Sequence, residues 1–155
     1  MTRITRYQGA IIRDHQILLI KHTEHASGHS YWLLPGGGIE PDETEERCVQ
    51  REMLEETCLH VQVQSLLLDE ASFPGDIYQH RKTYLCQLLE GEARPGYEPE
   101  AEAAAHYGIS EVGWFDLRHP TSWNEQIVHD PITYPVLQRI QAALGYWVGD
   151  GDPSV

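Results

Sequence analysis

The sequence lacks long apolar runs and a cysteine framework. Its apolar runs, such as Ile17–Ile20 and Leu66–Leu68, fall far short of the roughly 20 residues that span a bilayer. No apolar segment follows the basic start of the chain, so we expect no signal peptide. Its three cysteines, Cys48, Cys58 and Cys86, are odd in number and unclustered, which is typical of a reducing compartment. We therefore expect a cytoplasmic protein that binds no membrane.

Basic residues are also scarce. Lys and Arg total 11 against 24 acidic residues, giving a formal charge of −13. This balance argues against binding to a nucleic-acid polymer or an anionic membrane, because both need a basic face. It does not exclude a small anionic substrate, since a bound metal ion inverts the local charge. At 155 residues and 41% apolar content, the chain is expected to form one domain over residues 1–155.

Apolar periodicity and turn residues predict the order of elements. Between 43 and 57 there is no Gly or Pro, so we expect a helix there, with Pro41 and Asp42 at its start and Glu45 as a capping-box partner. The remaining expectations are a hairpin over 7–21, a loop over 22–30, strands over 61–64, 77–89 and 112–115, a mobile loop with one helical turn over 90–109, and a C-terminal helix closed by Gly145.

The predicted helix is unusually acidic. Eight of the seventeen residues from Glu40 to Glu56 are acidic, and Glu52, Glu55 and Glu56 share one helix face. Like charges at this spacing destabilise a helix by roughly 0.2–0.5 kcal/mol per pair. The face is either solvated surface or a site for a divalent cation, which takes carboxylate oxygens. Three glycines, Gly36–Gly38, precede it and permit the close backbone approach that a ligand-binding turn needs.

Together these residues resemble the Nudix box. The pattern is Gly37, five residues, Glu43, seven residues, Arg51-Glu52-Met53, one residue, Glu55-Glu56, one residue, Cys58-Leu59. It departs from the box at Cys58, where the family carries Gly. A glycine there would end the helix in a left-handed conformation, and a side chain at that position costs about 1–2 kcal/mol. A milder departure is Asp42, where relatives often carry Gly.

The resemblance implies an α/β fold, a Nudix-type α/β/α sandwich with a mixed sheet and an acidic loop-helix-loop metal site. It also implies a Mg²⁺- or Mn²⁺-dependent hydrolase that cleaves the diphosphate linking a nucleoside to another group. By position, Glu52, Glu55 and Glu56 would hold the metal, with Gly37 shaping the loop or offering a carbonyl. Arg51 would hold the carboxylates, with Glu43 as its partner. The sequence leaves homodimerisation open.

The general base is either a box carboxylate, Glu55 or Glu56, or a glutamate outside the box. Glu111, three residues before Trp114, is the outside candidate, and Glu98, Glu100 and Glu102 form an acidic loop that could also reach the site.

Other side chains suggest weaker hypotheses. Three histidines, His22, His25 and His29, indicate either a zinc site or a polar loop. Arg81, between His80 and Lys82, could steady a phosphate, and Trp123 and Tyr31 could stack on a base.

The leaving group is less constrained. In the family, a Pro about fifteen residues past the box is associated with substrates of the ADP-ribose type, and Pro74 lies fifteen residues after Leu59. The alternatives are a MutT-like (d)NTP pyrophosphohydrolase and a non-catalytic nucleotide-binding domain of the same fold. Because the box keeps its carboxylates, we expect an enzyme acting on a small nucleotide such as a nucleotide sugar.

Overall fold

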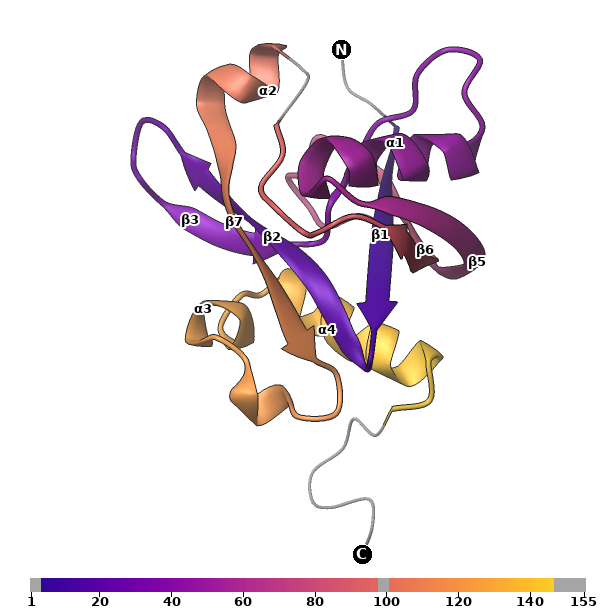
Figure 1. Ribbon diagram of the computed structural model, residues 1–155. Coiled ribbons are helices and arrows are strands. Elements are labelled where there is room, and N and C mark those ends of the chain that lie inside the picture. The colour runs from indigo at the N-terminus through magenta and orange to yellow at the C-terminus, as the bar shows by residue number, and fades with distance from the viewer. Residues whose placement is uncertain (1–3, 98–100, 147–155) are drawn as a thin grey trace, which may run out of the picture.

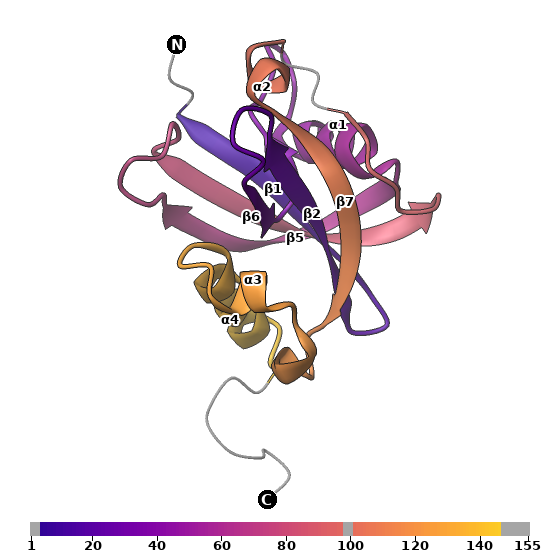
Figure 2. The same cartoon turned by 90° about the vertical axis from the view of Figure 1, so that its left-hand side faces the viewer.

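A mixed β-sheet lies between one helix on one side and two on the other (Figures 1 and 2). The computed structural model describes residues 4–97 and 101–146. Its strands are β1 (Thr5–Arg13), β2 (Gln16–Glu24), β3 (Ser30–Leu33), β4 (Gly36–Gly37), β5 (His60–Ala71), β6 (His80–Glu90) and β7 (Tyr107–Asp116). Its helices are α1 (Glu45–Thr57), α2 (Ala101–His106), α3 (Glu125–Val128) and α4 (Thr133–Ala143), with a 3₁₀ turn at Pro120–Ser122. The expected α/β/α sandwich is confirmed.

The sheet opens between its two central strands. The path of paired strands is β3-β2-β1-β6-β5, with β4 added to β1 and β7 added to β2; β1 and β6 are parallel and the other pairs antiparallel. Asp14 and His15, both at positive φ, form the turn between β1 and β2. These strands pair only beside that turn, at Arg13–Gln16 and Ile12–Ile17. Beyond the turn, β1 pairs with β6 and β2 pairs with β7. The start of β1 is therefore separated from the end of β2.

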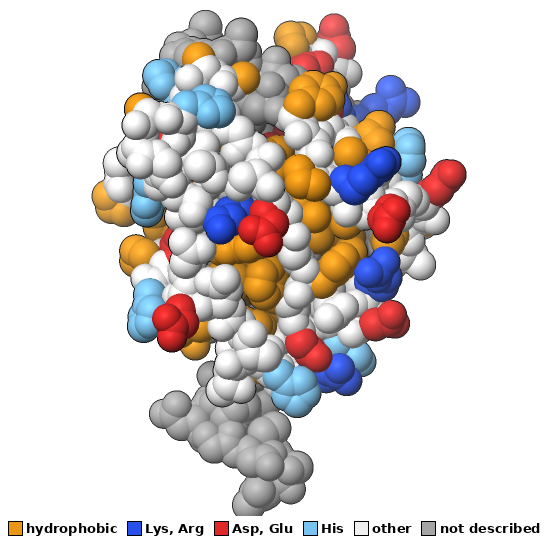
Figure 3. All heavy atoms as spheres, turned by 60° about the vertical axis from the view of Figure 1, so that its left-hand side comes forward, with side chains coloured by type: hydrophobic (Ala, Val, Ile, Leu, Met, Phe, Trp, Pro, Cys, Tyr) orange, Lys and Arg blue, Asp and Glu red, His pale blue; other side chains and the backbone are white. Residues whose placement is uncertain are grey.

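Each sheet face carries its own apolar core. Helix α1 packs Cys48, Val49 and Met53 on one face, while α4 packs Leu137 and Ile140 on the other. Within the described ranges, no helix is long and apolar enough to cross a membrane. On the surface shown in Figure 3, acidic and basic side chains are interspersed around apolar ones, so the negative charge forms no single patch there.

The predicted helix over 43–57 is confirmed, but its predicted cap is wrong. Thr44 is the N-cap, and its hydroxyl accepts a hydrogen bond from the N–H of Arg47 at 3.2 Å. Asp42 instead adopts a left-handed conformation with φ of 64°, as the glycine usual at this position would. The Glu45 carboxylate accepts hydrogen bonds from Lys82 and Tyr84 rather than returning to the backbone.

Several other boundaries differ from the predictions. The strand expected over 61–64 is the start of β5, which continues to Ala71 because bulges absorb the changes in side-chain alternation. The region 90–109 contains α2 and the start of β7, since β7 pairs along all of β2. The strand expected from 77 begins at His80, and β2 extends into the expected loop over 22–30. The C-terminal helix is confirmed, with Gly145 at φ of 83° after it.

Candidate active site

The acidic face of α1 is buried rather than solvated. Glu52 is 3% exposed and Glu56 is fully buried, whereas Glu55 is half-buried. The Oε1 atom of Glu56 accepts a hydrogen bond from the N–H of Gly36 at 2.6 Å. Buried carboxylates at a glycine turn do not fit the interpretation of this face as ordinary solvated surface, because burying a charge is costly unless something compensates it.

The glycine turn fits against this face only because it lacks side chains. A Cβ atom added to Gly37 would lie 2.4 Å from Oε1 of Glu52, and one added to Gly36 would lie 2.4 Å from the carbonyl oxygen of Tyr7. The turn is also strand β4, which pairs with Tyr7 and Gln8 of β1. The sheet therefore holds the turn directly against the acidic helix.

Arg51 joins the carboxylates to one another. Its Nε and Nη2 atoms donate to Glu43 at 2.7 and 2.9 Å, and its Nη1 atom donates to Glu52 at 3.0 Å and Glu55 at 3.2 Å. The Nη2 atom also donates to the carbonyl of Gly38 at 3.0 Å. These charge-assisted bonds lower the pKa of Glu43 and raise that of Arg51. One guanidinium thus orients three carboxylates and the end of the glycine turn.

The site retains an excess of negative charge. Burial raises the pKa of Glu52 to about 7, against the opposing influence of Arg51 and Arg6. Burial likewise raises the pKa of Glu55. A hard divalent cation such as Mg²⁺ or Mn²⁺ takes oxygen ligands of this kind and would offset the charge. The donor set therefore fits the expected ion, and Glu52, Glu55 and Glu56 are the side chains that would hold it.

The structure does not present a preassembled metal cluster. Among the described residues, no group of three or more His, Cys, Asp or Glu side chains is arranged to hold an ion. Arg51 engages oxygens of both Glu52 and Glu55, which would have to turn toward an incoming cation. The same finding removes support from the zinc hypothesis for His22, His25 and His29.

The C-terminal end of α1 is covered by a strap formed by residues 94–97. The backbone N–H groups of Arg94, Gly96 and Tyr97 donate to the carbonyls of Thr57, Glu56 and Glu55 at 3.0, 2.9 and 2.9 Å. A Cβ atom at Gly96 would lie 1.8 Å from the Glu55 carbonyl oxygen, so this contact requires glycine. The strap satisfies carbonyls that a helix end leaves without partners.

Cys58 adopts the conformation expected where the family carries Gly. It is the C-cap of α1, with φ of 64° and ψ of 21°, and its N–H donates to the carbonyl of Leu54 at 3.1 Å. The departure from the box therefore preserves the helix end at the cost of a left-handed residue with a side chain.

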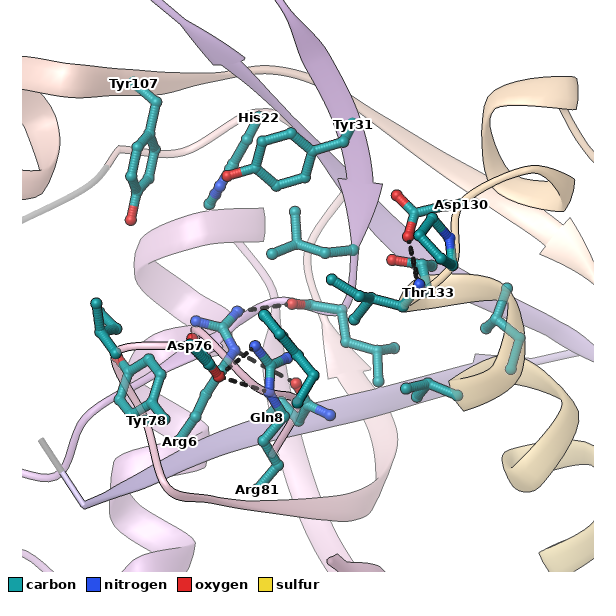
Figure 4. A pocket seen from close by; sticks show the side chains of 18 of the residues that line it. Arg6, Gln8, His22, Tyr31, Asp76, Tyr78, Arg81, Tyr107, Asp130 and Thr133 are labelled. Carbon is teal, nitrogen blue, oxygen red and sulfur yellow. Dashed lines mark hydrogen bonds and ion pairs between the residues drawn. The ribbon is translucent and has the colours of Figure 1, made fainter. Parts of the chain in front are cut away.

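A cavity of about 450 Å³ lies where β1 and β2 diverge (Figure 4). Arg6, 7% exposed, lines it and donates from Nη2 to the carbonyl of Leu34 at 2.9 Å. Burial acts to lower the pKa of Arg6, but Tyr78 and the charges of Glu56 and Glu52 outweigh it, so that the pKa is raised. Arg6 therefore lines the cavity and interacts electrostatically with carboxylates of the acidic helix.

Arg81 lies in this cavity, as a role in substrate binding requires. Its Nη2 atom pairs with Asp76 at 2.9 Å, and its Nε atom donates to the Ser72 hydroxyl at 2.9 Å. Tyr31 lines the cavity as well. Trp123 does not: it is 5% exposed within the core beneath α4, and its Nε1 atom donates to the carbonyl of Asp116 at 2.7 Å. Trp123 is therefore withdrawn as a residue that stacks on a base.

Glu111 projects from the sheet face opposite to α1. Its neighbours Val112 and Trp114 pack into the core beneath α1, and side chains alternate along a strand. The side chain is 58% exposed and pairs with Lys21 at 3.6 Å, whose ammonium lies 5.7 Å from the Trp32 ring on the α4 side. This placement does not bring Glu111 to the carboxylates, so we withdraw it as the general base.

The other candidates outside the box lie beyond what the structure describes. Glu98 and Glu100 fall outside the described residues, and the side chain of Glu102 is not described. Sequence reasoning did not bring together Arg6, Gln8, His22, Tyr78 and Tyr107, which line the cavity and come from distant segments. The alternation along β1 gave a signal for two of them, since Arg6 and Gln8 are polar residues on one side of an otherwise apolar strand.

Comparisons with known proteins agree with this geometry. A family model described as NUDIX domain matches residues 4–134. The "NAD-capped RNA hydrolase NudC" of Vibrio parahaemolyticus is 32% identical over 104 residues, covering 66% of this chain and 38% of the relative. The "ADP-ribose pyrophosphatase" of Methanocaldococcus jannaschii is 32% identical over 124 residues, covering 79% of this chain and 69% of the relative.

A solved structure of a NUDIX hydrolase from Nitrosomonas europaea superimposes with a TM-score of 0.69 at 21% identity, covering 94% of this chain and 75% of that one. At this identity the likeness concerns the fold. The chain spans little more than a third of the length of the NudC relatives, at 38%, 34% and 36%.

Proposed function

The chain belongs to the NUDIX domain family of hydrolases, and on that premise we propose that it uses Mg²⁺ or Mn²⁺ to cleave the diphosphate of a small nucleotide. The substrate we favour is a nucleotide sugar of the ADP-ribose type. The observation that carries the proposal is the contact of Gly36 and Gly37 with the buried carboxylates of Glu56 and Glu52, beside a cavity lined by Arg6.

Two comparisons bear on the substrate. The archaeal relative named an ADP-ribose pyrophosphatase aligns over most of both chains, which favours a nucleotide sugar. The NudC relatives are named for capped RNA but align over about a third of their length. A net charge of −13 does not favour a polyanionic polymer. A MutT-like activity on (d)NTPs is the second candidate, since the box itself does not specify the leaving group.

The carboxylates have distinct tasks in this proposal. Glu52, Glu55 and Glu56 would hold the ion, which would neutralise the diphosphate oxygens and lower the pKa of water. Arg51 and the Gly36 N–H fix the directions of these carboxylates. Glu55, the most exposed of the three with 16% of its side chain accessible, would accept the proton of the attacking water at a carboxylate oxygen.

The chain's own positive charges would act on the substrate. Arg6 and Arg81 both line the cavity, and their guanidinium groups can orient phosphate oxygens. All three cysteines are free thiols, which supports the proposed cytoplasmic setting. A homodimer stays a prediction.

The proposed function is tested by a release assay with Mg²⁺ over ADP-ribose, other nucleotide sugars, dinucleoside polyphosphates, (d)NTPs and NAD-capped RNA. We expect hydrolysis of ADP-ribose, with addition of one water, to AMP and ribose 5-phosphate. Preferred turnover of (d)NTPs would support the second candidate instead. If no substrate in the panel releases a phosphate-containing product, the hydrolase proposal fails and a nucleotide-binding role replaces it.

A further inference from the structure

We propose that the cavity between β1 and β2 is the subsite for the nucleobase and that His22 discriminates between bases. The inference rests on the proposed function, because it places the nucleoside at one end of the diphosphate that the acidic face would cleave. It goes further by naming the residue that determines specificity and the part of the substrate that this residue contacts.

Within the part of the chain that the structure describes, His22 is a buried side chain with unsatisfied ring nitrogens. It is 2% exposed, and neither Nδ1 nor Nε2 has a hydrogen-bond partner among the described residues. A buried donor or acceptor left unpaired destabilises the fold, so such groups are rare. The imidazole projects from β2 toward the cavity that it helps to line (Figure 4). A ligand in the cavity could provide the missing partner.

The charge state of His22 favours a base over a phosphate as that partner. Burial and the nearby positive charge of Arg6 lower the pKa of His22 to about 3. The imidazole is therefore neutral at physiological pH, with one N–H donor and one acceptor nitrogen. A phosphate offers only acceptors at its ionised oxygens, whereas the edge of a nucleobase offers both donors and acceptors. The neutral ring matches the base.

The surroundings of His22 suit a flat aromatic ring. The ring of Tyr107 stacks on the imidazole at a centroid distance of 4.4 Å and an interplanar angle of 26°, and the Tyr31 ring meets its edge at 5.6 Å. The apolar residues Leu33 and Ile132 contribute to the cavity lining. Its volume of about 450 Å³ lies within the usual range for small-molecule sites.

The charges of the cavity give the substrate a direction. Figure 4 shows His22, Tyr31 and Tyr107 along one side and Arg6 and Arg81 along the other. Among these residues, Arg6 is the one whose pKa is raised in part by the charges of Glu56 and Glu52 on α1. A nucleotide with its base at His22 and its phosphates toward Arg6 would thus extend its diphosphate toward the acidic face.

Tyr107 controls access to the imidazole. Both ring nitrogens of His22 are shielded from solvent, and Tyr107 lies across the ring. Tyr107 is the first residue of β7, directly after α2, and its side chain is half-buried. A base forms hydrogen bonds with the imidazole nitrogens at the edge of the His22 ring once the Tyr107 ring moves aside.

The test compares the parent with His22→Phe, which keeps a planar ring and removes both nitrogens. The control is His60→Phe, which removes an exposed imidazole on β5 away from the cavity. Kinetics are measured with Mg²⁺ on ADP-, GDP-, UDP- and CDP-ribose and on a diphosphate of two riboses that carries no base. His22→Gln, which retains a donor and an acceptor, serves as the conservative variant and as a substitute if the Phe variant does not fold.

We expect His22→Phe to raise KM for the preferred nucleotide sugar by about tenfold, the value of one lost hydrogen bond. The differences in kcat/KM among the four nucleotide sugars should become smaller. KM for the base-free substrate should change far less. His22→Gln should restore part of the differences among the nucleotide sugars. The inference is overturned if a folded His22→Phe variant keeps the base preference of the parent within twofold, or if turnover of the base-free substrate falls equally.

A binding arm separates this inference from the proposed function. Calorimetry measures the affinity of AMP, GMP, UMP and CMP for the parent and for His22→Phe, both without metal. If the parent hydrolyses nothing but binds one nucleotide preferentially through His22, the proposed function fails and the base subsite stands. If the parent hydrolyses nucleotide sugars while mononucleotide affinity is indifferent to His22, the base subsite fails and the proposed function stands.

Discussion

In the substitution Gly37→Ala, a methyl group enters the contact between the glycine turn and the acidic helix. The added Cβ would lie 2.4 Å from Oε1 of Glu52, whereas ordinary van der Waals contact begins at 3.4 Å. Because Glu52 is 3% exposed and its Oε1 atom accepts from Arg51, the carboxylate cannot move without breaking this bond. We expect the Glu52 carboxylate and the glycine turn to move apart by about 1 Å. A displacement of this size at a catalytic site lowers the rate roughly 10²-fold.

The assay measures kcat for the best substrate with saturating Mg²⁺, together with the free energy of unfolding in urea. Overpacking at a buried contact should lower that free energy by about 1–3 kcal/mol, which leaves the protein folded. The matched control is Gly28→Ala, at φ of 72° with no atom within 4 Å of the added methyl. It carries backbone strain of about 1–2 kcal/mol without touching the site. A folded Gly37→Ala variant with the parent's kcat would refute the reasoning.

Three other predictions concern residues around the site. Glu111→Gln should leave kcat within about twofold of the parent, because this side chain lies on the sheet face opposite to α1. Loss of a general base would instead lower kcat by about 10²–10⁴-fold. A hundredfold loss would therefore show that Glu111 takes part in the reaction. Gly96→Ala should lower the free energy of unfolding by about 2–4 kcal/mol, because the three strap hydrogen bonds are lost, and an unchanged urea midpoint would contradict this. His22 faces Arg6, Tyr31 and Tyr107, and burial together with the charge of Arg6 lowers its pKa from 6.5 to about 3. Below pH 6.5 the unfolded chain therefore binds one more proton than the folded protein. The free energy of unfolding consequently falls as the pH falls. Between pH 7.5 and pH 5 the parent should lose about 2 kcal/mol more than His22→Phe in urea unfolding, and equal losses would show that His22 titrates normally.

The acidic face of α1 and its contact with the glycine turn could be predicted because these contacts are local in sequence. The face shared by Glu52, Glu55 and Glu56 follows from helical periodicity, and the approach of Gly37 follows from a glycine turn joined to the helix by a short loop. The left-handed conformation at Cys58 was likewise predictable from its place at the helix end. One helix and the turn before it contain these relationships, so spacing suffices.

The cavity and the general base could not be predicted in the same way. Arg6, His22 and Tyr107 meet because β1 and β2 diverge after two paired positions, a feature of tertiary twist that no local pattern encodes. Glu111 was chosen from its spacing to Trp114, but spacing does not state which sheet face is occupied. The answer depends on the alternation of β7 relative to the two cores.

The central claim is that the buried carboxylates of α1 form a divalent-cation site, and a calorimetric titration of Mn²⁺ into the metal-free protein at neutral pH tests it most directly. Glu56→Gln keeps an oxygen for the Gly36 N–H and removes one negative charge. Glu46→Gln makes the same charge change at an exposed position of the same helix. The account predicts saturable Mn²⁺ binding to the parent, at least about tenfold weaker binding to Glu56→Gln, and parent-like affinity in Glu46→Gln. Equal Mn²⁺ affinity in the parent and Glu56→Gln, or no binding to the parent, would contradict it.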